Sequence, residues 1–163
     1  MKIFVDFDDV IFNARKFKED LIHIFLKHGI TRRDFENSYY TYSKRAQEFG
    51  KYYNPKDQIN VLKKKNSIDH KKLNKDIDNF MKDLRVYVFD DFYEFVSAFS
   101  KKDLFIITYG HKKFQLAKIR GAKVGRYFRE ILISKDNKIN IVSSVIKKYK
   151  FSPGKEDIIL IDD

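Results

Sequence analysis

The first thirteen residues, MKIFVDFDDVIFN, constrain the fold of this chain more than any other stretch. An apolar run ends abruptly in Asp6, Asp8 and Asp9, and a second apolar run follows at once. This pattern predicts a buried strand that carries carboxylates at its C-terminal end. Because carboxylates in such a place are costly unless they bind a cation or take part in chemistry, we expect the floor of a phosphate-handling active site.

Three further apolar runs, at 104–108, 130–133 and 158–161, are nearly continuous in Ile, Leu, Val and Phe. Such runs are typical of parallel strands covered on both faces. Helical patterns at 112–123 and 139–150 separate them. Strands that alternate with helices predict an open α/β sheet whose ligands bind at the C-terminal ends of the strands.

The interval from residue 14 to residue 85 has helical periodicity and almost no strand signal. Capping residues and a proline at a first helical position predict four helices, which begin near residues 14, 31, 55 and 67. A chain of 163 residues suffices for a core domain and a small inserted one. We expect the core at 1–13 and 86–163, and a mostly helical insertion at 14–85.

The net charge of +11 is concentrated in this insertion, which holds 18 of the 34 Lys and Arg but only 10 of the 23 Asp and Glu. Such a charge attracts phosphates and nucleic acids. A solvated, lysine-rich surface has the same composition and is the commoner explanation. Nucleic acid is therefore a possible partner but not the favoured one.

Composition also bounds the compartment and the kinds of site. The chain has no cysteine, which excludes disulfides and thiolate metal sites. No cleavable apolar segment precedes the acidic cluster, and no run approaches the roughly 18 apolar residues of a membrane helix. We expect a soluble, cytoplasmic protein with no membrane partner.

Asp6 and Asp8 are separated by one residue, so both would point to one face if the strand continued through them. One carboxylate would then attack phosphorus while the other donates a proton to the leaving oxygen. A capped turn is the alternative explanation for the pair taken alone.

Polar residues follow the other predicted strands as well: Thr108, Tyr109 and Gly110 follow the second, Lys138 comes after the third, and Asp162 and Asp163 follow the fourth. A hydroxyl and backbone amides beside a glycine suit a phosphate, and a lysine suits the negative charge of the nucleophile and the phosphoryl group. Ligands that are all oxygen favour a hard cation such as Mg²⁺.

This ordered set resembles the four motifs of the haloacid dehalogenase (HAD) superfamily of phosphohydrolases: DFDDV from Asp6, Thr108 after an apolar run, a lysine, and ILIDD ending at Asp163. The resemblance implies a Rossmann-like core, a Mg²⁺ cofactor and an aspartyl-phosphate intermediate. It implies that Asp6 is the nucleophile and Asp8 the general acid and base.

The resemblance also implies the remaining roles. Mg²⁺ would be held by Asp6, the backbone carbonyl of Asp8, and Asp163 with help from Asp162. Thr108, with Tyr109 and Gly110 in the same turn, would bind the phosphate. Lys138 would stabilise its charge; Lys135 is the alternative, and Lys138 is preferred because it directly precedes a helix.

The insertion resembles the family's C1 cap, a lid that closes over the site and chooses the substrate. An aspartate at position 8 favours phosphate chemistry, because the family's dehalogenases lack that acid. We therefore expect a Mg²⁺-dependent phosphohydrolase that acts on a small phosphorylated metabolite. A phosphotransferase or mutase would use the same Asp6, and a non-catalytic nucleic-acid-binding protein that uses the basic cap is the alternative from another class.

Members of the family usually continue with a further helix and strand after the fourth motif. We therefore expect either a longer chain beyond Asp163 or an exposed edge of the sheet.

Overall fold

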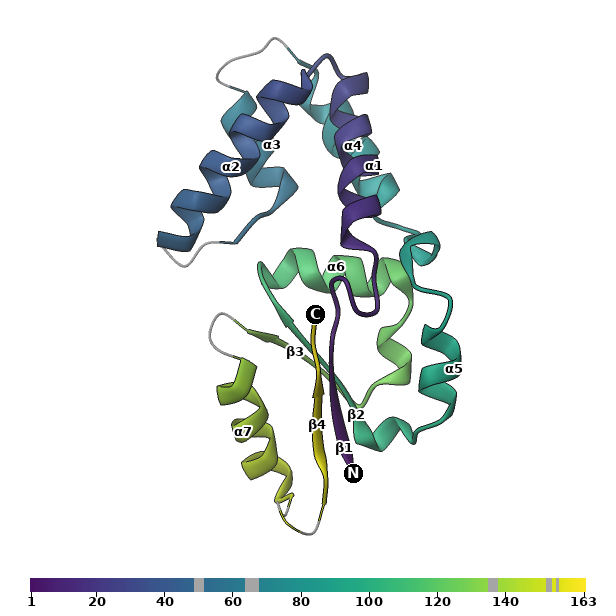
Figure 1. Cartoon of the computed structure of the whole chain (residues 1–163). Coiled ribbons are helices and arrows are strands. Elements are labelled where there is room, and N and C mark those ends of the chain that lie inside the picture. Colours follow the sequence, from purple (N-terminus) through teal and green to yellow (C-terminus); the bar gives the residue numbers. More distant parts are fainter. Residues whose placement is uncertain (49–51, 64–67, 135–137, 152–153, 155) are drawn as a thin grey trace. The chain divides into compact units, whose positions relative to one another are not determined.

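The computed structural model describes residues 1–163 apart from 49–51, 64–67, 135–137, 152, 153 and 155, and it describes no side chains within 41–51. Its contacts divide the chain into two units (Figure 1). The sheet unit comprises Met1–Ala14 and Leu84–Asp163, and the helical unit comprises Arg15–Asp83.

A four-stranded parallel sheet forms the centre of the sheet unit. Its strands are β1 (Lys2–Asp6), β2 (Leu104–Tyr109), β3 (Glu130–Ser134) and β4 (Ile158–Ile161). Their spatial order is β3-β2-β1-β4, and every pairing is parallel. The predicted open, parallel α/β sheet is thus confirmed, and each strand lies where an apolar run predicted it.

The register of the sheet sorts its side chains between two faces. Phe4 pairs with Phe105, and their rings stack with centroids 4.9 Å apart. This face is covered by α7 (Lys138–Tyr149), whose Val145 is buried against both rings. Helices α5 (Phe92–Ser97) and α6 (Lys112–Ala122) lie on the other side of the sheet from α7 (Figure 1). Both faces of β1 and β2 are therefore covered, as their apolar runs require, whereas β4 is partly exposed.

Short 3₁₀ turns complete the sheet unit: η1 (Arg85–Tyr87), η2 (Lys101–Asp103) and η3 (Gly125–Tyr127). Directly after the first of them, Val88 forms a bridge to Phe12. Asp91 precedes α5 and makes no side-chain capping bond.

The helical unit contains α1 (Ala14–Lys27, whose first residue belongs to the sheet unit), α2 (Arg32–Glu48), α3 (Pro55–Leu62) and α4 (His70–Phe80). The predicted capping residues act at α2 and α3: the N–H of Asp34 donates to the Thr31 hydroxyl (3.1 Å), and that of Lys56 donates to the Asn54 side chain (3.1 Å). Helix α4 is capped by Asp69 instead of Ser67, which lies outside the described residues.

One buried polar group lies within the apolar core of the helical unit. The Gln58 amide nitrogen donates to the Phe35 carbonyl and to the Ser38 hydroxyl, both at 2.9 Å, and its oxygen accepts from Tyr53 at 2.7 Å. These bonds tie α2, α3 and the segment between them together, because a buried amide is stable only with its partners in place. Across the described residues, no helix combines the length and the apolar character needed to cross a bilayer.

Candidate active site

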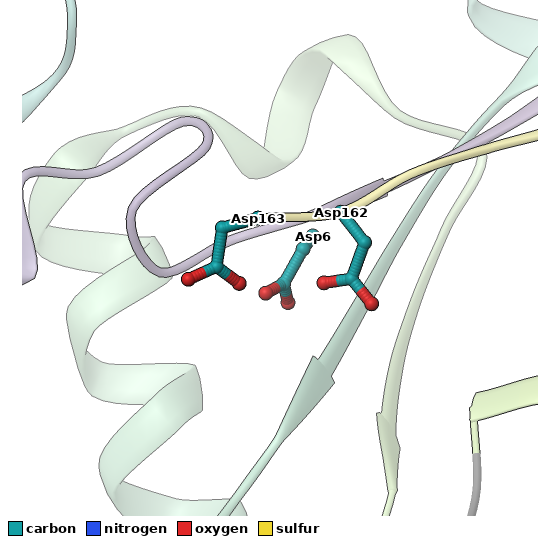
Figure 2. A group of neighbouring side chains, drawn as sticks. All are labelled: Asp6, Asp162 and Asp163. Carbon is teal, nitrogen blue, oxygen red and sulfur yellow. The ribbon is translucent and has the colours of Figure 1, made fainter.

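The acidic ends of the first and last strands meet at the centre of the sheet. β1 and β4 are neighbours, with Val5 opposite Ile161. Asp6, the last residue of β1, therefore lies beside Asp162, the first residue after β4. One carboxylate oxygen from each of Asp6, Asp162 and Asp163 lies within 4.8 Å of the others, and Figure 2 shows the three groups directed to the same side. The strand order reverses at β1, and ligands of open α/β sheets bind at such a point.

Lys138 joins two of these carboxylates. It is the first residue of α7, and its ammonium lies 3.0 Å from Asp6 Oδ2 and 2.6 Å from Asp162 Oδ1. Asp6 has the same parity along β1 as Phe4, so its side chain is directed to the face that α7 covers. The structure therefore brings Lys138 to Asp6, while Lys135 lies outside the described residues.

Burial and the neighbouring charges have opposite effects on the pKa values of Asp6 and Lys138. Asp6 is only 5% exposed, and burial raises its pKa to about 6, against the lowering effect of hydrogen bonds from Lys138 and from the Phe7 amide. The hydrogen bond from Lys138 lowers the pKa of Asp162. Burial lowers the pKa of Lys138, but its bonds to Asp162 and Asp6 outweigh that effect, so its pKa is raised. Lys138 thus stays charged beside a carboxylate that lacks full hydration.

The three carboxylates fit a hard divalent cation. They offer oxygen ligands only, at spacings that one ion can bridge, and hard cations such as Mg²⁺ prefer such ligands. The Asp8 carboxylate is not part of this group in the described chain. A role for Asp8 through its backbone carbonyl, as the family resemblance implies, stays a prediction.

The turn after β1 separates Asp8 from Asp6. The N–H of Ile11 donates to the Phe7 carbonyl (3.1 Å), and Asp9 has φ +58°, in the left-handed region. The strand therefore ends at Asp6, and residue 8 does not continue it. The condition for Asp6 and Asp8 to share one face, a strand that runs through both, is not met.

Helix α6 supplies the partners of Asp8. The Gln115 amide nitrogen donates to Asp8 Oδ2 (2.8 Å), and the Lys118 ammonium is ion-paired with Oδ1. The same ammonium lies 5.4 Å from the centroids of three rings: Phe7, Phe12 and Phe114. Burial lowers the pKa of Lys118, against the raising effect of Asp8. Asp6 thus takes its cation from α7 and Asp8 takes its cation from α6.

Sequence reasoning did not single out Gln115 or Lys118. Both are buried and lie on the stripe of α6 that also carries Ile119 and Ala122. The spacing of these four residues is that of one helical face. Two polar residues on an otherwise apolar helical stripe are the signal in the sequence that points to them.

The predicted phosphate turn lies at the end of β2. Thr108 is buried, and its hydroxyl accepts from the Gln115 amide nitrogen (3.1 Å), which also donates to the Tyr109 carbonyl (2.8 Å). The Tyr109 side chain is exposed. Gly110 has φ +140°. Its N–H donates to the carbonyl of Ser134, the last residue of β3 (3.3 Å), so this amide already has a hydrogen-bond partner. The phosphate-binding roles of these three residues stay predictions.

No protein-family model matches the sequence, and a comparison with curated proteins finds no match. Solved structures do match, over nearly the whole chain. One of them is YfnB from Bacillus subtilis, a proposed HAD-hydrolase that is bound to magnesium in its crystal structure. YfnB is 21% identical to this chain, with a TM-score of 0.57 over 98% of this chain and 76% of its own. The fold is that of the haloacid dehalogenase structures.

Two further structures support the same HAD-like fold. A haloacid dehalogenase-like family hydrolase from Xanthomonas campestris is 16% identical, with a TM-score of 0.58 over 100% of this chain and 74% of its own. A dehalogenase in an intermediate complex is 12% identical, with a TM-score of 0.59 over 98% of this chain and 74% of its own. These likenesses concern the fold, while the chemistry depends on the side chains at the strand ends.

Proposed function

We propose that this chain is a HAD-type hydrolase, a Mg²⁺-dependent phosphohydrolase that removes phosphate from a small phosphorylated metabolite through an aspartyl-phosphate on Asp6. The observation that carries the proposal is the setting of Asp6. Its buried carboxylate lies 3.0 Å from the Lys138 ammonium and within 4.8 Å of an oxygen of Asp162 and of Asp163, at the switch point of a HAD-like sheet. A nucleophile for a phosphoryl group needs this combination of desolvation and nearby positive charge.

In the first half of the reaction, an Asp6 oxygen attacks phosphorus and the bond from phosphorus to the leaving oxygen breaks. Asp8 enters this step in its acid form, donates the proton to that leaving oxygen and becomes the carboxylate that pairs with Lys118, so the product departs as an alcohol. The Thr108 hydroxyl accepts from Gln115 and keeps its own hydrogen for a phosphate oxygen. Lys138 places its charge beside the nucleophile.

In the second half, Asp8 takes a proton from water while the water oxygen attacks phosphorus. The bond from phosphorus to Asp6 breaks, which releases inorganic phosphate and restores both carboxyl groups. When bound by Asp6, Asp162 and Asp163, Mg²⁺ supplies positive charge that offsets the excess of carboxylates and polarises the phosphoryl group.

We propose further that the helical unit is a cap of the C1 type and selects the substrate. Three observations support this role. The unit is inserted between β1 and β2, it has a core of its own, and the interval 14–85 carries a net charge of +8, which favours anionic substrates. Exchange of this unit for the cap of another HAD enzyme should change substrate preference and leave the requirement for Asp6 unchanged.

The test is phosphate release from a panel of sugar phosphates, nucleotides and phospho-acids, with Mg²⁺ and with a chelator. Asp6→Asn should abolish turnover and keep the fold, because an amide of the same shape cannot attack phosphorus. Asp103→Asn is the matched control: this carboxylate also pairs with a lysine in the sheet unit, at the other end of β1. Undiminished hydrolysis by Asp6→Asn would overturn the proposal.

The same panel separates the alternatives. Transfer of phosphate to an added sugar hydroxyl would identify a phosphotransferase or mutase, and halide release from 2-haloacids would identify a dehalogenase. Salt-dependent binding of RNA or DNA without any phosphate release would identify the nucleic-acid-binding alternative.

A further inference from the structure

The Gln115 side chain links Asp8, the proposed proton donor, to Thr108, the proposed phosphate-binding residue. The Gln115 amide nitrogen lies 2.8 Å from Asp8 Oδ2, 3.1 Å from Thr108 Oγ1 and 2.8 Å from the Tyr109 carbonyl oxygen. A carboxylate and a carbonyl only accept hydrogen bonds, so the nitrogen of this amide faces them, and its two hydrogens are shared among the three acceptors. Asp8 and Thr108, which lie a hundred residues apart in the chain, thus share one donor.

The second partner of Asp8 is equally constrained. Lys118 is 5% exposed, and its ammonium lies 5.4 Å from the centroids of the Phe7, Phe12 and Phe114 rings. Burying an ammonium is costly unless a carboxylate compensates it. Two donors from consecutive turns of α6, at positions 115 and 118, therefore hold one oxygen each of the Asp8 carboxylate.

This arrangement is not the one that stability alone favours. The Gln115 oxygen is buried and has no hydrogen-bond partner among the described residues. A buried acceptor without a donor destabilises the folded state. An apolar side chain on the same stripe of α6 would avoid that cost. The backbone also accommodates this amide, because a Cβ on Gly110 would approach its nitrogen to 3.2 Å.

We infer that Gln115 and Lys118 are positioning residues that hold the Asp8 carboxyl group and the Thr108 hydroxyl in one fixed relation. The inference rests on the proposed function, in which Asp8 transfers the proton and Thr108 binds the phosphate. With the phosphate fixed by Thr108, the shared amide sets where Asp8 lies relative to the leaving oxygen. Lys118 acts through Asp8, and Gln115 acts through Asp8 and Thr108.

Proton transfer matters most when the leaving group is poor, and this supplies the test. An alkyl phosphate such as glycerol 2-phosphate needs the acid, whereas p-nitrophenyl phosphate releases a stable anion and needs it little. Gln115→Met and Lys118→Met remove the polar groups and keep the side-chain length. Each should lower the ratio of kcat/KM for the alkyl over the aryl substrate by about tenfold or more, because misplacing a catalytic group costs on the order of 10²-fold.

Lys2→Met is the matched control, since Lys2 is also a buried lysine paired with a carboxylate, Asp103, in the same unit. Its substrate ratio should equal that of the wild type. In an Asp8→Asn background, adding Gln115→Met should lower the ratio no further, because a residue that acts through Asp8 has nothing left to position.

The outcomes separate this inference from the proposed function. Wild-type protein that hydrolyses neither substrate with Mg²⁺ overturns both. Wild-type hydrolysis with an unchanged ratio in Gln115→Met and Lys118→Met overturns the positioning role alone. An equal fall in Lys2→Met, or a further fall in the Asp8→Asn background, shows a general effect on the fold and also overturns it.

Discussion

Both ends of β1 carry lysines and carboxylates, but in different numbers. At the N-terminal end, the buried Lys2 ammonium pairs with Asp103, lies 3.6 Å from Glu156, and stacks over the Phe151 ring at 4.8 Å. At the C-terminal end, two lysines face four carboxylates: Lys118 and Lys138 face Asp6, Asp8, Asp162 and Asp163. A lysine therefore ties the strand to its surroundings at both ends.

The difference lies in how the negative charge is arranged. Asp103 and Glu156 flank a single cation, and each is partly exposed, so water completes their solvation. Asp6 is buried within reach of two further carboxylates, and its raised pKa reflects that burial. Proteins keep such an arrangement where it serves a ligand or a reaction. The N-terminal end thus fits a stabilising role, and the C-terminal end fits the cation and the phosphate of the proposed function.

The contrast is tested most strongly by removing Lys138. Lys138→Ala should lower kcat by roughly 10²–10³-fold, because it removes the charge beside the nucleophile and the phosphoryl group. Steady-state kinetics on the best substrate measures the loss. Lys148→Ala is the control: it lies at the other end of α7, pairs with Glu130 at 2.7 Å, and should keep full activity. Equal activity of the two variants would contradict the role of Lys138.

Removing Lys2 should give the opposite pattern. Lys2→Met should lower the free energy of unfolding by about 3 kcal/mol, because it leaves a partly buried Asp103 without its cation. The kcat of the folded variant should match that of the wild type. Urea denaturation and kinetics below the transition check both parts; a loss of kcat without a loss of stability would show that the two ends of β1 are coupled.

The burial of Asp6 should cost stability in the absence of metal. Its pKa is 3.8 when unperturbed and about 6 in the folded chain, so the folded state holds the proton more tightly. Stability should therefore fall as pH rises from about 4 to about 6. In a chelator at pH 7.5, Asp6→Asn should be more stable than the wild type by about 3 kcal/mol, and the two should converge near pH 4. Thermal unfolding across this range measures the difference, and Asp103→Asn should not show it.

The smallest expected effect concerns the outer carboxylates. Asp163→Asn should raise the Mg²⁺ concentration for half-maximal activity by about tenfold, because it removes the charge of one of three oxygen ligands. Titration of activity with Mg²⁺ measures the shift. Asp157→Asn, on the approach to β4, changes the charge by the same amount outside the group and should leave the titration unchanged. An identical shift in both would indicate a general charge effect.

The sheet could be predicted because its information is local. Each strand coincides with an apolar run, and the helices between them carry their own periodicity and caps. Asp6 also followed from the sequence, since a carboxylate at the end of a buried strand has few structural explanations. The family resemblance implied that Asp6 and Asp162 hold one ion, and the pairing of β1 with β4 brings the two residues together.

The surroundings of Asp8 could not be predicted, because they depend on contacts distant in sequence. The turn after β1 is held by bonds from the Asn13 N–H to the Tyr87 carbonyl and from the Phe89 N–H to the Ile11 carbonyl. No pattern within residues 6–13 specifies those partners. Polar residues in a helix are usually solvated, and only the tertiary structure shows that Gln115 and Lys118 face the interior.

The neighbouring positions of β1 and β4 also matter for how the chain assembles. Lys2 pairs with Ile158, so this ladder joins residues from nearly opposite ends of the 163-residue chain. Closing so long a loop has an entropic cost that contacts nearer in sequence avoid, and pairings of this kind form late. The acidic trio exists only once that last ladder has formed. A cation bound there would favour the fully assembled chain over any partly folded form, so metal affinity becomes a measure of completed folding.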